Sequence, residues 1–318
     1  LWAQTLKVTA GTNMVDAGNT QAAPIAPAAA SGPAPAFAID VAQLGGMYAG
    51  KIVMVGTEAG VGVRNAGHIG ATVGEVIVSA DGKLSHSGSL SAASNVGVTA
   101  SSVENGGTLY ARGTLEINTP GDITNTGGSG AVIAAGADAT LSARRIEGDR
   151  QALFAAGLSE GGSLAGTGKL TLTAGEQITT RGQQAAGGDL AISARELDLS
   201  STRNSARSIV FAAQGGDLDL SGATTLTAGT MTAHAAQKLA HAGAQSHAGQ
   251  LDLAAHTLDN RRGELVQIGS GDTRLALAGD LDNRAGRIAV NSHKLELAAR
   301  TLDNAAGRIE HAGAGTLT

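Results

Sequence analysis

The feature that most constrains the fold of this sequence is a short unit that returns about every 20 residues. Each copy has an apolar residue, an Asn or His two positions later, and a Gly two positions after that. The first four copies begin at positions 63, 84, 103 and 123, so the intervals are 21, 19 and 20 residues. Self-similarity at this period predicts a solenoid. The paired polar and glycine positions are Asn65 and Gly67, His86 and Gly88, Asn105 and Gly107, and Asn125 and Gly127.

The unit returns near the C-terminus with one residue added before the glycine. These copies begin at positions 258, 281 and 302, at intervals of 23 and 21 residues. A second phrase, Gly-x-apolar-x-apolar, starts at Gly113, Gly168, Gly188, Gly216 and Gly249. The spacing of two between its apolar residues indicates strands rather than helices. The late polar and glycine pairs are Asn260 and Gly263, Asn283 and Gly286, and Asn304 and Gly307.

A coil of roughly 20 residues cannot satisfy its own backbone hydrogen bonds or bury its own apolar face. Stacking the coils does both, because each strand pairs in parallel with the same strand one turn away, at about 4.8 Å. The sequence therefore predicts an all-β fold, a parallel β-helix with at least two short strands in each turn. Roughly 14 turns at this spacing give a rod of about 65–70 Å.

The recurring Asn residues are expected to have a structural role. At the same place in every coil they would form a ladder in which each side-chain amide donates to the next copy along the axis. An alternative is a left-handed turn position beside the Gly. The fourteen ladder and turn positions named above are the candidate site residues, and we expect no catalytic, cofactor-binding or metal-binding residues.

Composition narrows the class of protein. The chain has 47 Gly, 2% aromatic and 15% charged residues, which suits thin coils with small residues inside and Gly at the corners. A net charge of −5 with scattered basic residues gives no footprint for nucleic acid. No apolar run approaches the roughly 18 residues of a membrane span. The absence of Cys excludes a disulfide framework and suits a chain that is exported unfolded.

The chain divides into three parts by pattern. Residues 1–20 contain a short alternating strand and read as the last coil of something that begins upstream. Residues 21–36 hold four of the five prolines among Ala and Ser, which predicts an extrahelical loop or linker. Residues 37–318 form the β-helix shaft. The pattern is still running at Thr318 and no starting Met is present, so we expect an internal piece of a longer protein.

One stretch carries a family resemblance. The run from Phe37 through Met54 to Gly67 resembles the segment that follows the secretion domain in filamentous haemagglutinin-like exoproteins. The Leu-Asp-Asn repeats at 258, 281 and 302 are similar to the repeats of that family. These are two-partner secretion proteins, which include adhesins and contact-dependent growth inhibition proteins. Residues 1–20 resemble the tail of the family's secretion domain.

The resemblance implies a right-handed β-helix and a structural function. The chain would be a shaft that holds an adhesive or toxic tip away from the bacterial surface. Its implied partners are an outer-membrane two-partner secretion transporter and a host or neighbouring bacterial cell surface. The implied location is secreted or cell-surface, after export through the periplasm and the outer membrane.

Several motifs suggest chemistry and each has a plainer interpretation. Gly45–Lys51 fits the spacing of a phosphate-binding P-loop, but Ile52 stands where Ser or Thr is needed and the following residues read as a strand. His234, His241, His247 and His256 have intervals that match no compact zinc site. Asp217 with Asp219, and Asp280 with Asp282, place two carboxylates on one strand face, as a polysaccharide-cleaving β-helix would. They also occupy outward positions that a half-exposed strand makes polar in any case.

Two alternatives to a shaft remain open. The Gly-x-apolar-x-apolar phrases at 168, 188, 216 and 249 are 20, 28 and 33 residues apart, which predicts turns of unequal length and loops projecting between 144 and 250. Such loops could bind a receptor or glycan, and the pairs Arg144–Arg145 and Arg261–Arg262 could meet sulfated glycans. The second alternative is an enzyme that degrades polysaccharide on the same fold. The scarcity of aromatic residues disfavours both, because binding hot spots and sugar sites are rich in them.

Overall fold

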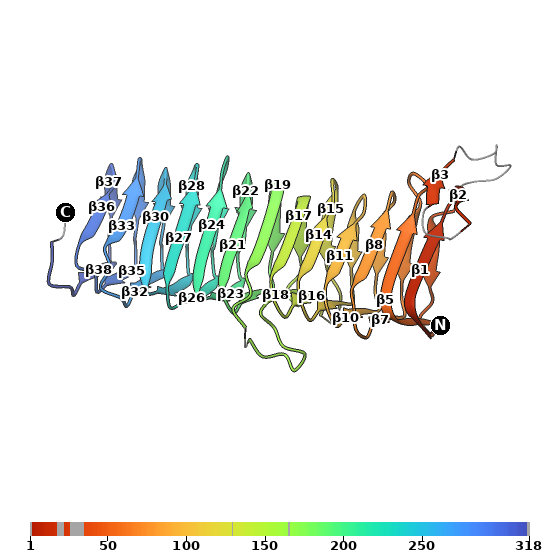
Figure 1. Cartoon of the computed structure of the whole chain (residues 1–318). Coiled ribbons are helices and arrows are strands. Elements are labelled where there is room, and N and C mark those ends of the chain that lie inside the picture. Colours follow the sequence, from red (N-terminus) through yellow and green to blue (C-terminus); the bar gives the residue numbers. More distant parts are fainter. Residues whose placement is uncertain (1, 18–21, 26–34, 129, 165, 317–318) are drawn as a thin grey trace.

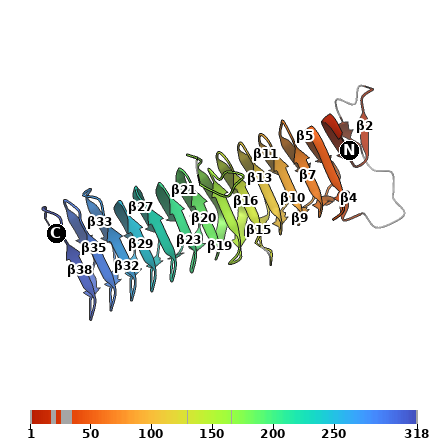
Figure 2. The same ribbon diagram turned by 90° about the horizontal axis from the view of Figure 1, so that it is seen from below.

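The computed structural model describes residues 2–17, 22–25, 35–128, 130–164 and 166–316 and shows a rod of stacked β-coils. Every pairing in the main sheet is parallel between one coil and the next. The described part makes about 13 turns of about 21 residues, and it contains no helix. The parallel β-helix is therefore confirmed, and its right-handed sense stays a prediction from the resemblance. Figures 1 and 2 show the coils following one another in sequence order from one end of the rod to the other.

Each regular coil has three short strands, one on each of three faces. The strands of the first face are β4 (Phe37–Val41), β6 (Gly62–Asn65), β9 (Leu84–His86), β12 (Val103–Asn105), β15 (Asp122–Asn125), β22 (Glu196–Asp198), β25 (Leu218–Asp219), β28 (Lys238–Ala240), β31 (Thr257–Asp259), β34 (Asp280–Asp282) and β37 (Thr301–Asp303). The strands of the second face are β7 (His68–Ala71), β10 (Ser89–Ala92), β13 (Thr108–Ala111), β16 (Val132–Ala135), β18 (Leu153–Ala156), β20 (Gln183–Ala186), β23 (Arg203–Ala206), β26 (Thr224–Thr227), β29 (Gln245–Ala248), β32 (Glu264–Gln267), β35 (Arg287–Val290) and β38 (Arg308–His311).

The third face completes the coil. Its strands are β1 (Trp2–Ala10), β8 (Val76–Ala80), β11 (Val96–Thr99), β14 (Leu115–Asn118), β21 (Asp189–Ala194), β24 (Ser208–Ala213), β27 (Thr230–Ala235), β30 (Gln250–Ala255), β33 (Thr273–Leu277) and β36 (Leu295–Ala298). Four strands cross a corner and belong to two faces each. These are β1, whose first residues pair with the second-face part of β5, together with β5 (Gly46–Gly56), β17 (Ala139–Gly148) and β19 (Leu170–Thr180).

The core is a thin column inside the three faces. Inward residues alternate with outward ones along each strand, as in β8, where Val76 and Val78 are fully buried. Leu, Ile, Val and Ala fill the interior, and Phe154 and Phe211 are the largest side chains among those fully buried. One continuous cluster extends from Ile39 to Leu295, so each coil packs on its two neighbours rather than on a central core.

The N-terminal residues are stacked on the rod. β1 pairs in parallel with β5, from Trp2 opposite Tyr48 to Ala10 opposite Gly56. Between β1 and β4 the chain forms a separate antiparallel pair, β2 (Asn13–Val15) with β3 (Ala22–Pro24), which takes no part in the helical ladder. Residues 21 and 26–34 of the predicted loop, and residues 18–20 before it, lie outside the described residues. The assignment of 1–20 to a secretion-domain tail stays a prediction.

The prediction of unequal turns was wrong for the coils between Gly188 and Gly249, but it was right for one earlier coil. The phrase at Gly216 lies on the first face, in β25, whereas those at 188 and 249 lead into β21 and β30 on the third face. The true third-face series is Leu190, Ile209, Met231 and Leu251, so successive coils are 19, 22 and 20 residues long. The interval from Ala139 to Leu170 is 31 residues, and this coil carries an excursion between β18 and β19.

Candidate functional site

The recurring Asn residues lie in one column at the corner between the first and second faces. We call this column the amide corner. Its backbone register places Asn65 opposite His86, His86 opposite Asn105, and Asn105 opposite Asn125. These four side chains are at most 2% exposed, although all are polar. Buried polar groups need hydrogen-bond partners, so the corner is a place where the chain must satisfy them internally.

In the C-terminal coils the side chains form a continuous file. His241 Nδ1 donates to Asn260 Oδ1 at 2.7 Å, Asn260 Nδ2 donates to Asn283 Oδ1 at 2.7 Å, and Asn283 Nδ2 donates to Asn304 Oδ1 at 2.6 Å. Every donor points toward the later coil. Ser246 Oγ donates to His241 Nε2 at 2.8 Å, so both ring nitrogens are used and the imidazole is held neutral.

In the N-terminal coils the file is interrupted. Asn65 Nδ2 donates to His86 Nδ1 at 3.1 Å, and Asn105 Nδ2 donates to Asn125 Oδ1 at 2.7 Å. His86 Nε2 turns instead to the backbone and donates to Thr108 O at 3.0 Å. The Asn oxygens also accept from their own turns, as where Gly67 N donates to Asn65 Oδ1 at 3.1 Å.

The glycines of the unit are required by close approach of the backbone. A Cβ on Gly88 would lie 2.0 Å from Gly67 O, and one on Gly286 would lie 2.2 Å from Asn260 O. Gly67, Gly107, Gly127, Gly263 and Gly307 are equally confined, with the nearest atom at 2.1–2.8 Å. None of these seven glycines has a positive φ.

The left-handed position is instead the residue added in the late copies. Arg262, Ala285 and Ala306 have φ values of 56°, 54° and 56°. The same place holds Ser201, Gly222 and Gly243 in the three coils before them, with φ values of 61°, 66° and 64°. The added residue keeps the ladder intact around the corner, since Ala285 N donates to Ala305 O at 3.0 Å.

Burial perturbs the two histidines of the corner in the same direction. It lowers the pKa of His241 to about 4, and it also lowers the pKa of His86, because the charged imidazolium would lose its hydration inside the coil. We expected surface or corner histidines, and His241 is a corner histidine but is buried. Both are neutral at pH 7 and act as hydrogen-bonding members of the column.

In the middle of the rod the amide corner holds neither Asn nor His. Gly148, Thr180, Leu199 and Leu220 continue the positions between Asn125 and His241. The inward column of the second face changes in the opposite sense: elsewhere it carries apolar residues, mostly Ile or Leu, but here it carries polar residues. These polar residues are Gln184, Asn204, Thr225 and Ser246. Sequence reasoning missed them, although polar residues at strand positions occupied by Ile or Leu in other coils were a visible signal.

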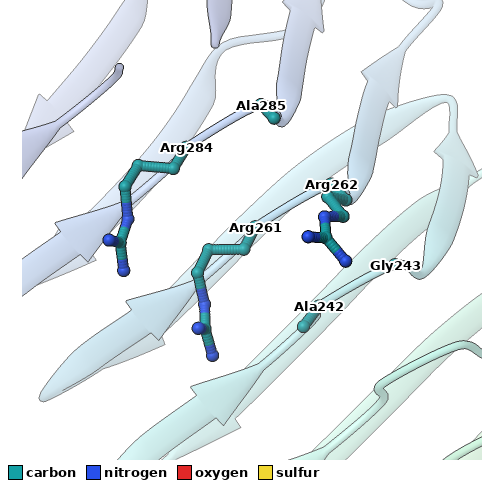
Figure 3. A pocket seen from close by; sticks show the side chains of 6 residues that line it. All are labelled: Ala242, Gly243, Arg261, Arg262, Arg284 and Ala285. Carbon is teal, nitrogen blue, oxygen red and sulfur yellow. The ribbon is translucent and has the colours of Figure 1, made fainter. Parts of the chain in front are cut away.

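Three of the four arginines in the basic pairs, Arg144, Arg145 and Arg261, form ion pairs along the rod. Arg261 Nη2 lies 2.7 Å from Asp259 Oδ2, and Arg284 Nη2 lies 2.7 Å from Asp282 Oδ2. Each arginine also reaches the aspartate of the next coil, at 3.6 and 3.4 Å. Figure 3 shows Arg261 and Arg284 running parallel at the edge of a hollow that Arg262 also lines. Arg144 and Arg145 similarly share Glu176. These contacts leave little free positive charge for a sulfated glycan.

The remaining candidate residues are also occupied or separate. Asp217 and Asp219 accept backbone N–H groups from Lys238 and Ser221 at 3.0 and 2.8 Å. Hydrogen bonds lower the pKa values of Asp280, from Thr301 and Arg300, and of Asp282, from Arg284, opposite to what a general acid requires. Over the residues that the structure places, no group of His, Asp or Glu could hold a metal ion. The P-loop-like run enters strand β5 rather than a helix.

In the described ranges no helix is long and apolar enough to cross a membrane.

The family model described as "Haemagglutinin repeat" matches residues 8–88, 71–127, 155–222, 192–285 and 268–318. No solved structure gives a significant match.

Curated relatives match over different lengths of the chain. Toxin CdiA of Yersinia pestis is 36% identical over 295 residues, which is 92% of this chain and 9% of that protein. tRNA nuclease CdiA-2 of Burkholderia pseudomallei is 52% identical over 92 residues, 29% of this chain and 3% of that protein. 16S rRNA endonuclease CdiA of Enterobacter cloacae is 31% identical over 275 residues, 77% of this chain and 8% of that protein. The chain thus spans less than a tenth of the length of these relatives.

Proposed function

Because the chain belongs to the haemagglutinin-repeat family, we propose that it is a shaft segment of a large secreted bacterial exoprotein, which holds a distal adhesive or toxic element away from the cell. The observation that carries this proposal is the parallel ladder that continues in register from β4 to β38. Continuous ladders resist bending, and the number of coils sets the length.

The shaft would be exported through an outer-membrane two-partner secretion transporter and displayed at the cell surface, facing a host or neighbouring bacterial cell. The resemblance of Phe37–Gly67 to that class of exoproteins supports this route, as do the CdiA relatives. We assign no catalysis to this segment. The carboxylates that could have served it are engaged in turns and ion pairs, such as Asp280 with Arg300 at 3.1 Å.

Lengthening the shaft in the parent exoprotein tests the proposal. Residues 261–283 are one coil, because Asn260 and Asn283 occupy the same position 23 residues apart. Ten extra tandem copies should move the tip outward by about 48 Å, measured by electron tomography of the cell surface. Ten Gly/Ser linkers of equal length are the control and should give a broad distribution of distances. A tip distance that does not change with added coils would refute the shaft.

One observation favours a second candidate, a direct binding module. The excursion after β18 lies over the outer side of the second face, where Tyr110 Oη donates to Leu158 O at 3.0 Å. Ala134, Ala155 and Ala185 are buried beneath it. If this loop bound a receptor, the purified chain would bind target cells saturably, and replacing residues 159–163 by a short linker would abolish that binding. The shaft proposal predicts no saturable binding in either case.

A further inference from the structure

The interior of the rod contains a cluster of polar atoms that no protein atom satisfies. Thr180 Oγ1, both amide atoms of Gln184, and Asn204 Oδ1 each expose less than 1 Å² and have no hydrogen-bond partner among the described residues. The residues themselves are 0%, 0% and 2% exposed. Four of the seven unsatisfied buried side-chain atoms found in the described chain thus belong to three residues. Buried amides and hydroxyls are nearly always hydrogen-bonded, so this cluster requires an explanation.

The fold brings these three side chains together. Gln184 in β20 pairs with Asn204 in β23 on the next coil, so their backbones are about 4.8 Å apart. Thr180 lies at the amide corner of the same coil, at the end of β19, and Gln184 lies just past that corner in β20. The equivalent pair three coils later, His241 and Ser246, is in direct hydrogen-bond contact across this corner at 2.8 Å.

The neighbouring residues cannot supply the missing bonds. On the earlier coil the positions opposite Thr180 and Gln184 are Gly148 and Phe154, a residue without a side chain and an apolar ring. On the later coil Leu199 occupies the corner. Asn204 Nδ2 donates to Thr202 Oγ1 at 2.9 Å and to Thr225 Oγ1 at 3.4 Å, and the Asn204 oxygen has no donor among the described residues. Gln184 and Asn204 differ by one methylene, so their amides do not stack as those of Asn105 and Asn125 do.

We propose that the shaft binds ordered water here, bridging Gln184 to Thr180 and Asn204 inside the rod. A water molecule both donates and accepts, which suits a site that combines an amide N–H₂ with amide and hydroxyl oxygens. The three side chains are uncharged. A cation would therefore bring uncompensated charge into an apolar interior, and water is the favoured ligand.

A crystal structure of the chain at about 1.5 Å tests the proposal. The expected result is a density peak about 2.8 Å from a Gln184 amide atom and from Thr180 Oγ1 or Asn204 Oδ1. A direct hydrogen bond from Gln184 to Asn204 or Thr180 with no solvent between them would overturn it. A peak that gives an anomalous signal after soaking in Rb⁺ would also overturn it, because the ligand would then be a cation.

A solution experiment makes the test independent of crystals. Oxygen-17 relaxation dispersion counts water molecules that stay bound for microseconds. Gln184→Leu gives this coil the Leu that the same column carries at Leu265, and it should lower the count by at least one. Leu265→Met, in the same column but away from the cluster, is the control and should leave the count unchanged. A count that is equal in the wild type and Gln184→Leu would overturn the proposal, and the crystal experiment on the wild type stands if that variant fails to fold.

Discussion

The two halves of the rod turn the same corner in different ways. In the coils up to Asn125 the chain passes from the Asn or His to the Gly through one residue, and the oxygens of Asn65 and Asn105 accept from the Gly N–H of their own turns. From Ser201 onward an added residue in the left-handed region takes up the turn, and the N–H of the residue after it bonds to a backbone oxygen, as from Gly286 N to Asn283 O at 3.0 Å.

The difference shows what the added residue does for the column. When the turn is closed by backbone atoms, the Asn oxygen is free to accept from the coil before it, and the amides form one file from His241 to Asn304. When the turn uses the side chain, the file breaks into pairs. In the late coils the side-chain hydrogen bonds continue from one coil to the next. The backbone at Arg262, Ala285 and Ala306 is strained there, because it adopts the left-handed conformation.

The largest expected effect comes from a methyl group at a glycine of the early corner. Gly88→Ala places a Cβ 2.0 Å from Gly67 O, which is backbone and cannot move aside. We expect a loss of about 4 kcal/mol in unfolding free energy, measured by chemical denaturation. Gly243→Ala is the matched control in the late half, because its Cβ meets no atom within 4 Å and carries only the left-handed penalty of about 1–2 kcal/mol. Equal losses would contradict the steric account.

The next effect is a dependence of stability on pH that originates in His241. Its pKa is about 4 in the fold and about 6.5 in the unfolded chain, so between these values the unfolded chain binds more protons. Stability is therefore full above about pH 6.5 and falls by about 3 kcal/mol as the pH drops to about 4. His241→Asn extends the amide file and should remove most of this slope. Exposed His234→Ala should leave it unchanged, and an unchanged slope in His241→Asn would contradict the assignment.

A smaller effect separates the continuous file from the paired amides. Asn283→Ala takes the Oδ1 acceptor from Asn260, whose other acceptors lie at 3.4 Å, and should cost about 2 kcal/mol. Asn125→Ala should cost less, because Asn105 Nδ2 keeps two backbone acceptors at 3.1 Å. Thermal unfolding of both variants measures the difference. A greater loss for Asn125→Ala would reverse the ranking of the two halves.

The smallest expected effect is a gain in stability. Ala285→Gly relieves left-handed strain at φ 54°, but it also makes the unfolded chain more flexible. The net result should be a stabilisation of about 0.5 kcal/mol, seen as a small rise in the unfolding temperature. Ala289→Gly, in strand β35 of the same coil, has no such strain to relieve and should be destabilising. A destabilising Ala285→Gly would show that strain at this corner is negligible.

Most of the fold could be predicted from the repeats, because spacing along the chain determines which residues share a face. The period predicted the parallel β-helix, and the Asn positions were expected in one column. The third strand of each coil was less visible, since β25 reads as the same Gly-x-Leu-x-Leu phrase as the third-face strands. Because of that likeness, the intervals between the phrases were mistaken for the lengths of the coils. Hydrogen-bond direction and the left-handed residues depend on contacts between coils that no single repeat reveals. The polar interior at Gln184 was visible in the sequence, but only from a comparison of the same strand position in successive coils.

The most direct measurement removes one coil. Deleting residues 261–283 joins Asn260 to Arg284 and takes away β32, β33 and β34, so the file would continue from Asn260 to Asn304. Deleting residues 261–271 removes only part of a coil and puts every later strand out of register. If stacked coils and the amide corner specify the fold, circular dichroism will show native β content and cooperative unfolding after the first deletion and their loss beyond residue 260 after the second. Equal damage from both deletions would contradict the account.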